Sequence, residues 1–257
     1  MIDSHIHLDA DQYADPSGAI KRAQEAGVAA MIAPGTGGGS NQQVIELARR
    51  YPRVVYAACG YHPERFDLTD ADAEEAIATI RSEHKSLAAV GEVGMPWYGD
   101  TARRPEVIAK ARQILARFAR VAVEVDLPVI IHAPHDGALE ALRVLCEAGV
   151  QRAVFHWHKS DDATTRAILD AGYFISLTPE VAYRDRDMRL ARMVPLGRML
   201  VETDGPWPFG GPFEGCPTEP SMVVETVEAI ARVLKLRREL VGAVTTTNAR
   251  MLFRIPP

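Results

Sequence analysis

The segment VIIHAPHDGALEALRVLCEAGVQRAVFH, residues 129–156, contains the repeating unit of the fold. Two short apolar runs, Val129–His132 and Ala153–His156, flank an amphipathic segment of helical length, Gly137–Glu147. Parallel strands joined by crossover helices produce this pattern. The segment therefore predicts a strand, a helix and a second, parallel strand.

The same alternation continues from one end of the chain to the other. It predicts strands near Ile2–His7, Ala29–Ala33, Val54–Cys59, Ala88–Val93, Val129–His132, Ala153–His156, Tyr173–Leu177 and Met199–Glu202. It predicts helices at Pro16–Glu25, Ser40–Arg50, Ala71–Glu83, Glu106–Val125, Gly137–Glu147, Asp161–Asp170 and Pro220–Lys235. Eight strands in 257 residues favour a (β/α)8 TIM-type barrel over an open doubly wound sheet. Because no linker rich in proline, glycine or serine divides the chain, we expect one domain over residues 1–257.

Composition narrows the classes of protein that remain. The chain is 47% hydrophobic and 25% charged, which is ordinary for a globular protein. Its net charge of -5 argues against non-specific coating of nucleic acid, but it allows a local basic groove or a metal-assisted phosphate site. Three scattered cysteines are too few for a disulfide framework or a CxxC metal site. Without a secretory leader or an apolar run of membrane length, we expect a cytoplasmic protein away from membranes. No obligate protein partner is evident, and the oligomeric state stays open.

Polar residues of the types that bind metals follow several predicted strands. They are His5, His7, Glu92, His132, His156 and Asp204. A barrel gathers the C-terminal ends of its strands on one face, where its active sites lie. His5 and His7 are two apart on the first predicted strand, so both side chains should point to the same side. Each residue alone has an ordinary explanation, such as a core histidine or a helix-capping acid. Together, at the ends of five strands, they indicate a metal site.

We expect this site to hold two divalent ions. A carboxylate such as Glu92 can bridge two cations, and imidazoles with carboxylates suit Zn, Mn, Fe or Ni. We expect Zn, Mg or Mn, with the identity left open. The first ion is assigned to His5, His7, Asp204 and Glu92, and the second to Glu92, His132 and His156. Such a pair can lower the pKa of a bound water and hold the attacking and leaving oxygens of a hydrolysis.

Motifs in order along the chain resemble those of the TatD family of metal-dependent hydrolases. They are DSHIHLD at residues 3–9, GEVG at 91–94, VIIH at 129–132, FH at 155–156 and ETDGP at 202–206. Gly60–Pro63 (GYHP), Glu219–Pro220 and Asn248 resemble further positions of the family.

The resemblance implies a metal-dependent (β/α)8 barrel of the amidohydrolase-like superfamily, acting as a deoxyribonuclease on phosphodiester bonds. It implies that Asp204 is a metal ligand and possible general base, and that Glu92 joins it in catalysis. Glu202 and His62 would lie behind the ligands or contact the substrate, orienting ligands or water. The expected substrate is a DNA end or a small molecule.

Departures from the family concern groups expected to hold a phosphate. Pro96 stands where the family has an aspartate, and Pro134 stands where it has an arginine. The family's Arg-Asn-Glu-Pro is Pro217–Pro220 here, and Trp157-His158 replaces a cysteine-aromatic pair. Arginine is the usual fork for phosphate oxygens. Its loss keeps open a second hypothesis, hydrolysis of a carboxylic ester, lactone, amide or aminoacyl ester.

Other residues offer replacements for the missing charge. The candidate cations are His135, His158, Lys159, Arg184 and Arg186. The candidate stacking rings are Trp97, Trp157 and Trp207, although tryptophan at a barrel rim is as often packing. A third hypothesis is a catalytically inactive metal-binding or scaffold protein. The presence of all six proposed ligands argues against it.

Overall fold

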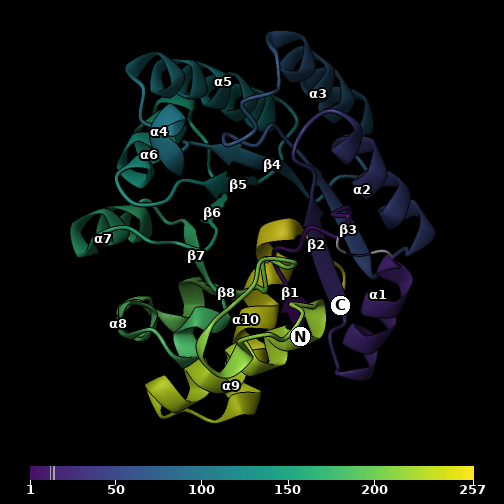
Figure 1. Ribbon diagram of the computed structural model, residues 1–257, viewed down its shortest axis with the longest axis vertical. Helices are drawn as coiled ribbons and strands as arrows, with labels where there is room; N and C mark the ends of the chain where they lie inside the picture. The colour runs from purple at the N-terminus through teal and green to yellow at the C-terminus, as the bar shows by residue number, and fades with distance from the viewer. Residues whose placement is uncertain (12, 14) are drawn as a thin grey trace.

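The computed structural model describes residues 1–11, 13 and 15–257, and in this part of the chain eight strands form one parallel sheet in the order β1 to β8 (Figure 1). The strands are β1 (Ile2–Asp3), β2 (Ala30–Pro34), β3 (Val55–Cys59), β4 (Ala89–Gly94), β5 (Val129–His132), β6 (Ala153–Phe155), β7 (Phe174–Leu177) and β8 (Met199–Val201). Each strand pairs with the next in sequence. The predicted α/β barrel is confirmed.

Backbone hydrogen bonds bridge the remaining gap between β8 and β1. The N–H of Ser4 donates to the carbonyl oxygen of Val201 at 3.0 Å, and the N–H of Asp204 donates to that of His5 at 2.9 Å. Because these bonds join the first and last strands, the sheet curves into a nearly closed barrel.

Helices surround the strands (Figure 1). They are α1 (Pro16–Glu25), α2 (Gly39–Arg50), α3 (Asp70–Glu83), α4 (Gly99–Ala102), α5 (Pro105–Glu124), α6 (Gly137–Ala148), α7 (Asp162–Asp170), α8 (Asp185–Met193), α9 (Val223–Leu234) and α10 (Arg238–Phe253). Short 3-10 turns are η1 (Pro179–Ala182), η2 (Leu196–Arg198), η3 (Gly211–Phe213) and η4 (Pro220–Met222). The predicted helices are present to within a few residues, whereas α4, α8 and α10 were not predicted. Among the described residues, no helix combines the length and apolarity needed to cross a membrane.

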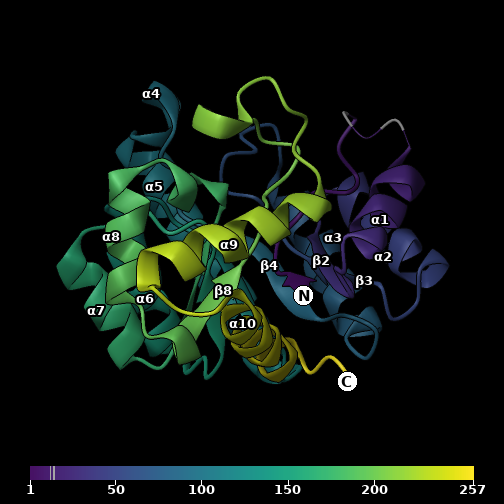
Figure 2. The same cartoon turned by 90° about the horizontal axis from the view of Figure 1, so that it is seen from below.

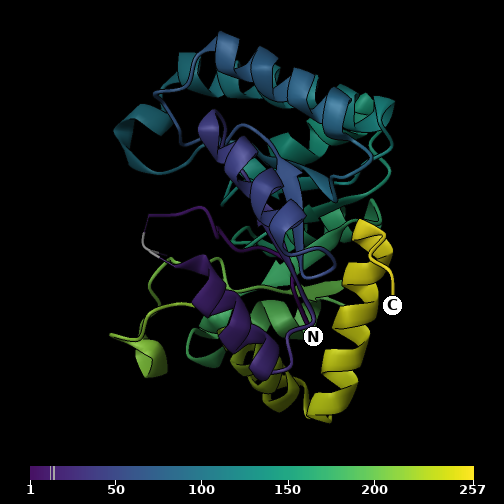
Figure 3. The ribbon, with the colours of Figure 1, turned by 90° about the vertical axis from the view of Figure 1, so that its right-hand side faces the viewer.

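Helix α10 closes one end of the barrel. The interior is filled from alternate positions of successive strands, including Ile32, Ala58, Ile130, Val154 and Leu200. Leu252 and Phe253 of α10 pack against these side chains. Figure 3 shows α10 at one end and the loops that follow β1 and β8 at the other, and Figure 2 shows α9 beside α10. The C-terminal ends of the strands therefore lie at the open end of the barrel, opposite α10.

Candidate metal centre

The alternation of side chains along the strands directs polar residues into the open mouth of the barrel. The last inward-facing apolar residues of β5, β6 and β8 are Ile130, Val154 and Leu200. Two residues further along each segment stand His132, His156 and Glu202. Since side chains two apart on an extended segment share a side, these three polar groups point to the barrel axis.

Strand β4 also directs a polar residue into the barrel mouth, but it does so through a shift in its register with β5. Ala89 faces the interior, whereas Val90 and Val93 both face the helices. The register with β5 shifts between those two valines. Glu92, next to the outward-facing Val93, consequently turns inward and is fully buried. Glycine at position 60 permits this course, because a Cβ there would overlap the backbone of Glu92.

Four ligand-type atoms meet at one point of the mouth. The Nε2 atoms of His5 and His7 are 3.2 Å apart. Each lies 3.3 to 3.5 Å from Oε2 of Glu92 and from Oδ1 of Asp204. A tetrahedral metal with bonds near 2.1 Å separates its ligand atoms by about 3.4 Å. The two imidazole nitrogens therefore lie at the spacing of metal ligands from each other and from both carboxylate oxygens.

We expected His5 and His7 to approach each other because they share one face of a strand, and this expectation was wrong. Strand β1 ends at Asp3, so His5 and His7 do not share a strand face. They lie in the turn that follows, where the N–H of Leu8 donates to the carbonyl oxygen of Ile6. This turn, and not strand alternation, brings the two imidazoles together.

Three further ligand-type atoms meet on the other side of Glu92. Nδ1 of His132 is 2.8 Å from Oε1 of Glu92 and 3.1 Å from Nε2 of His156. Nε2 of His156 is 2.7 Å from the same carboxylate oxygen. Glu92 thus presents Oε2 to the first set of atoms and Oε1 to the second. The structure brings all six predicted ligands together, with Glu92 between the two sets.

The chemistry of these atoms fits metal ions. Oε2 of Glu92 and Oδ1 of Asp204 are buried and have no hydrogen-bond partner among the described residues. Buried carboxylate oxygens are costly unless a donor or a cation satisfies them. Burial raises the pKa of Glu92, but the charges of His62 and His156 outweigh this effect and hold that pKa well below its usual value. The carboxylate stays ionised, as a metal ligand must.

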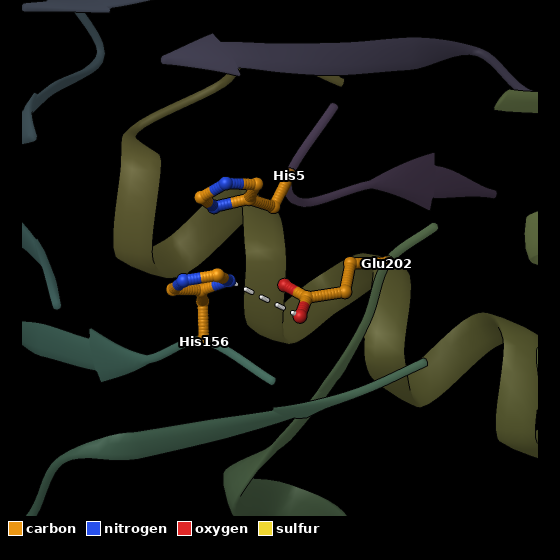
Figure 4. Close-up of side chains that lie close together, drawn as sticks. All are labelled: His5, His156 and Glu202. Carbon is orange, nitrogen blue, oxygen red and sulfur yellow. Dashed lines mark ion pairs between the residues drawn. The ribbon is translucent and has the colours of Figure 1, made fainter. Parts of the chain in front are cut away.

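Glu202 lies beside His156, and the dashed line in Figure 4 marks the contact between them. Its Oε1 is 3.5 Å from Nδ1 of His156 and accepts the N–H of Trp157 at 2.6 Å. Its Oε2 accepts the hydroxyl of Ser176 at 2.7 Å. Although His5, His156 and Glu202 form a compact group, both oxygens of Glu202 already accept hydrogen bonds. Glu202 therefore fits the role of orienting His156 better than that of a ligand.

His62 approaches Glu92 from the loop after β3. Its Nε2 is 3.3 Å from Oε1 of Glu92, and its Nδ1 accepts the N–H of Glu64 at 3.1 Å. A neutral His62 consequently carries its proton on Nε2 and donates it to Glu92. This geometry favours a hydrogen-bond donor over a ligand.

Glu64 was not singled out from the sequence. It accepts the N–H groups of Trp97 and Tyr98 at 2.6 and 3.1 Å, and it lies 3.7 Å from Nε2 of His132. The available signal was its place two residues after His62 in a loop at the barrel mouth. Glu64 ties the loop after β4 to the second set of ligand atoms.

Other motif residues secure the segments around the site. The carboxylate of Asp3 accepts the N–H groups of His5 and Thr203. Glu219 pairs with Arg22 of α1. The side chain of Asn248 donates to the carbonyl oxygens of Leu196 and Met199. These contacts fix the loops after β1 and β8 and attach α10 to the barrel.

The two proline departures lie in the loops that follow two neighbouring strands, β4 and β5. Gly94 of β4 pairs with His132 of β5, and Pro96 and Pro134 each follow two residues later. The aspartate and the arginine expected at these positions would therefore stand in neighbouring loops at the barrel mouth, and both are absent here.

The candidate cations differ in their surroundings. His158 is buried against Oγ1 of Thr165, and burial lowers its pKa to about 4, which makes it the weaker candidate for a cation. Arg184 and Arg186 both pair with Glu180. Burial lowers the pKa of His135 as well. Lys159 is half-buried at the mouth and forms no ion pair with a carboxylate of the described residues.

The three tryptophans also differ in access. Trp157 has the ammonium group of Lys159 3.4 Å from its ring centroid. The ring of Trp97 is covered by His135, with a centroid separation of 4.8 Å. The side chain of Trp207 is 57% exposed. Trp207 is the tryptophan with most room for a stacked base.

Comparison with known proteins identifies relatives along the whole chain. A family model described as TatD related DNase matches residues 2–254. A Mycobacterium tuberculosis protein named uncharacterized metal-dependent hydrolase TatD is 35% identical, over 98% of this chain and 97% of its own. A Homo sapiens protein named deoxyribonuclease TATDN3 is 29% identical, over 98% of this chain and 94% of its own.

Solved structures agree on the fold. The crystal structure of YJJV, a TatD homologue from Escherichia coli K12, superposes with a TM-score of 0.91 at 24% identity, covering 100% of this chain and 98% of that one. The family match confirms the resemblance seen in the motifs and, with it, the prediction of a metal-dependent hydrolase. The chain therefore belongs to the TatD related DNase family.

Proposed function

We propose that this chain hydrolyses phosphodiester bonds at the ends of DNA strands with the help of two divalent metal ions. The observation that carries the proposal is the position of Glu92 between two sets of ligand-type atoms. The first ion would be held by His5, His7, Glu92 and Asp204, and the second by Glu92, His132 and His156. The name of the human relative supports DNA as the substrate.

When bound, a pair of divalent ions would supply Lewis acidity and a water of lowered pKa. Asp204 would accept the proton of the attacking water. Burial raises the pKa of Asp204, but the approach of His7 and the charges of the nearby histidines hold that pKa below its usual value, so a carboxylate base is available. Glu202 would keep Nε2 of His156 directed at the centre, and His62 would hold Glu92 in place.

A carboxylic ester, lactone, amide or aminoacyl ester is the second candidate substrate. The observation in its favour is Pro134, which stands where an arginine is expected. The same centre would then direct water at a carbonyl carbon. Two features favour the phosphodiester: the exposed ring of Trp207, and Lys159, which has no carboxylate partner within the described part of the chain.

Activity assays on reloaded protein test the proposal. Purified protein is stripped with a chelator, reloaded with Mg, Mn or Zn, and assayed for nucleotide release from single-stranded DNA ends beside a panel of carboxylic esters. We expect metal-dependent nucleotide release that falls by about a hundredfold or more in Asp204→Asn and His5→Ala, because each removes a proposed ligand.

The control is His84→Ala, which removes a histidine at the end of α3 and should keep full activity. Cleavage of esters without release of nucleotides from DNA would reject the phosphodiesterase. Unchanged nucleotide release by Asp204→Asn would reject the proposed centre.

A further inference from the structure

Aromatic rings hold the side chain of Lys159 at the barrel mouth. Its Nζ lies 3.4 Å from the centroid of the Trp157 ring and 6.0 Å from that of Tyr98. It donates to the hydroxyl of Tyr98 at 3.4 Å. Rings of this kind attract an ammonium group without neutralising its charge. The lysine is thus positioned and partly desolvated, yet it keeps its charge and N–H donors for another partner.

Trp157 is itself fixed. Its indole N–H donates to Glu180 at 2.8 Å, and its backbone N–H donates to Glu202 at 2.6 Å. Its ring packs edge-on against Trp207 and Phe209, with centroid separations of 5.7 and 5.6 Å. The surface under the ammonium group is therefore rigid, and it is connected through Glu202 to His156.

Tyr98 connects the same ammonium group to the other side of the centre. Its backbone N–H donates to Glu64, and its ring lies 6.4 Å from that of His132. Lys159 therefore lies between the loop after β4, which carries Tyr98, and the loop after β6, which carries Trp157. Tyr98 lies near His132, and Trp157 donates to Glu202 beside His156. The charge of Asp204 also acts on Lys159. An anion bound at the metal centre would lie within the field of this cation.

We propose that Lys159 binds a non-bridging oxygen of a phosphate group at the metal centre, supplying the positive charge expected from arginine at position 134. This inference rests on the proposed phosphodiesterase function and identifies a residue that would select phosphate esters over neutral esters. Lysine suits the role because its ammonium group is a compact charge with three donors. In this assignment Trp157 supports the lysine and does not stack a base.

Binding of inorganic phosphate to the metal-loaded protein tests the assignment without catalysis. Isothermal titration compares the natural chain with Lys159→Met, Lys159→Gln and Lys159→Arg, and metal content is measured for each. A charge-assisted hydrogen bond is lost in the first two variants. We expect their dissociation constants for phosphate to rise about tenfold or more at unchanged metal content, and Lys159→Arg to restore most of the affinity.

Lys85→Met is the matched control, because Lys85 is an exposed lysine between α3 and β4, at the opposite end of the barrel. Its phosphate affinity should equal that of the natural chain. Equal phosphate affinity in Lys159→Met and Lys85→Met, or no phosphate binding by the natural chain, would overturn the proposal.

Kinetics separate this proposal from the proposed function. With a phosphodiester, Lys159→Met should raise KM about tenfold or more, whereas KM for neutral p-nitrophenyl acetate should change less than twofold. If the natural chain cleaves phosphodiesters and Lys159→Met keeps the natural KM, the lysine assignment fails and the function stands. If the natural chain cleaves no phosphodiester but binds phosphate through Lys159, the function fails and the anion site stands.

Discussion

The carboxylate of Glu202 lies 3.5 Å from Nδ1 of His156, and the N–H of Trp157 and the hydroxyl of Ser176 fix it there. Nδ1 of His156 therefore faces a carboxylate, while Nε2 faces Glu92. An acid behind a histidine ligand sets its tautomer and raises its basicity. The second ligand set thus depends on a residue outside it.

Replacing Glu202 should weaken the second metal ion more than the first. In Glu202→Gln the carboxylate behind His156 becomes a neutral amide, and loss of such a group costs about 10- to 100-fold in metal affinity. Stepwise metal titration against a competing chelator would measure both sites. Glu214→Gln, which changes an exposed acid, should leave both affinities unchanged. Equal weakening of the two sites would contradict the assignment of Glu202 to His156.

Metal removal should lower the free energy of unfolding. Buried atoms such as Oε2 of Glu92 and Oδ1 of Asp204 then have no partner among the described residues. Binding to the folded state alone contributes about 4 kcal/mol when free metal exceeds its dissociation constant a thousandfold. Urea unfolding with metal and with excess chelator measures the difference. It should shrink in Asp204→Asn, and an equal difference in that variant would place the stabilising metal elsewhere.

The contact of α10 with the barrel interior should dominate the stability of that end. Phe253 is 4% exposed and packs among the interior side chains, so Phe253→Ala should lower the free energy of unfolding by about 3 to 5 kcal/mol. Met251 on the same helix is 58% exposed, and Met251→Ala should change it by less than about 0.5 kcal/mol. Urea unfolding of chelated samples compares the two, and similar values would show that α10 does not serve as a plug.

Binding of a phosphodiester at the metal-loaded centre should weaken between pH 7 and pH 9.5. Burial lowers the pKa of Lys159 to about 8. Only the protonated lysine attracts an anion, so affinity is full below that pKa and is lost as the pH rises through it. A bound anion favours the charged form and moves the midpoint upward. The groups that face this lysine are Tyr98, His135, Glu180, Arg186, Asp187 and Asp204.

Diphenyl phosphate is a suitable probe, because its own charge is constant over this range. Arginine stays charged throughout, so Lys159→Arg should bind the probe equally well at pH 7 and pH 9.5. The same decline in Lys159→Arg as in the natural chain would assign the titration to another group.

The sequence was sufficient to predict the gathering of the six ligand-type residues, because the ends of parallel strands in a barrel must meet. His132 and His156 close recognisable apolar runs, and the other four stand within a few residues of one. The extent of β1 was not predictable in this way, since the apolar alternation of Ile2, Ile6 and Leu8 continues past Asp3, where pairing stops.

Other features depend on contacts that local sequence does not encode. Helix α10 carries Gly242 and the run Thr245–Thr247, which are weak helix formers, and packing of Leu252 and Phe253 in the barrel supports it. The position of Lys159 follows a bend at Trp157, where φ is 37°. A tryptophan rarely adopts that angle, and its hydrogen bond to Glu202 is a tertiary contact.

The hydrogen bond from the N–H of Asp204 to the carbonyl oxygen of His5 joins two segments that are translated at different times. Of the six ligand-type residues, His5 and His7 are translated first and their partner Asp204 is translated last. Glu92, His132 and His156 are all translated earlier. The first ligand set can therefore form only after β8 has been made and has closed against β1.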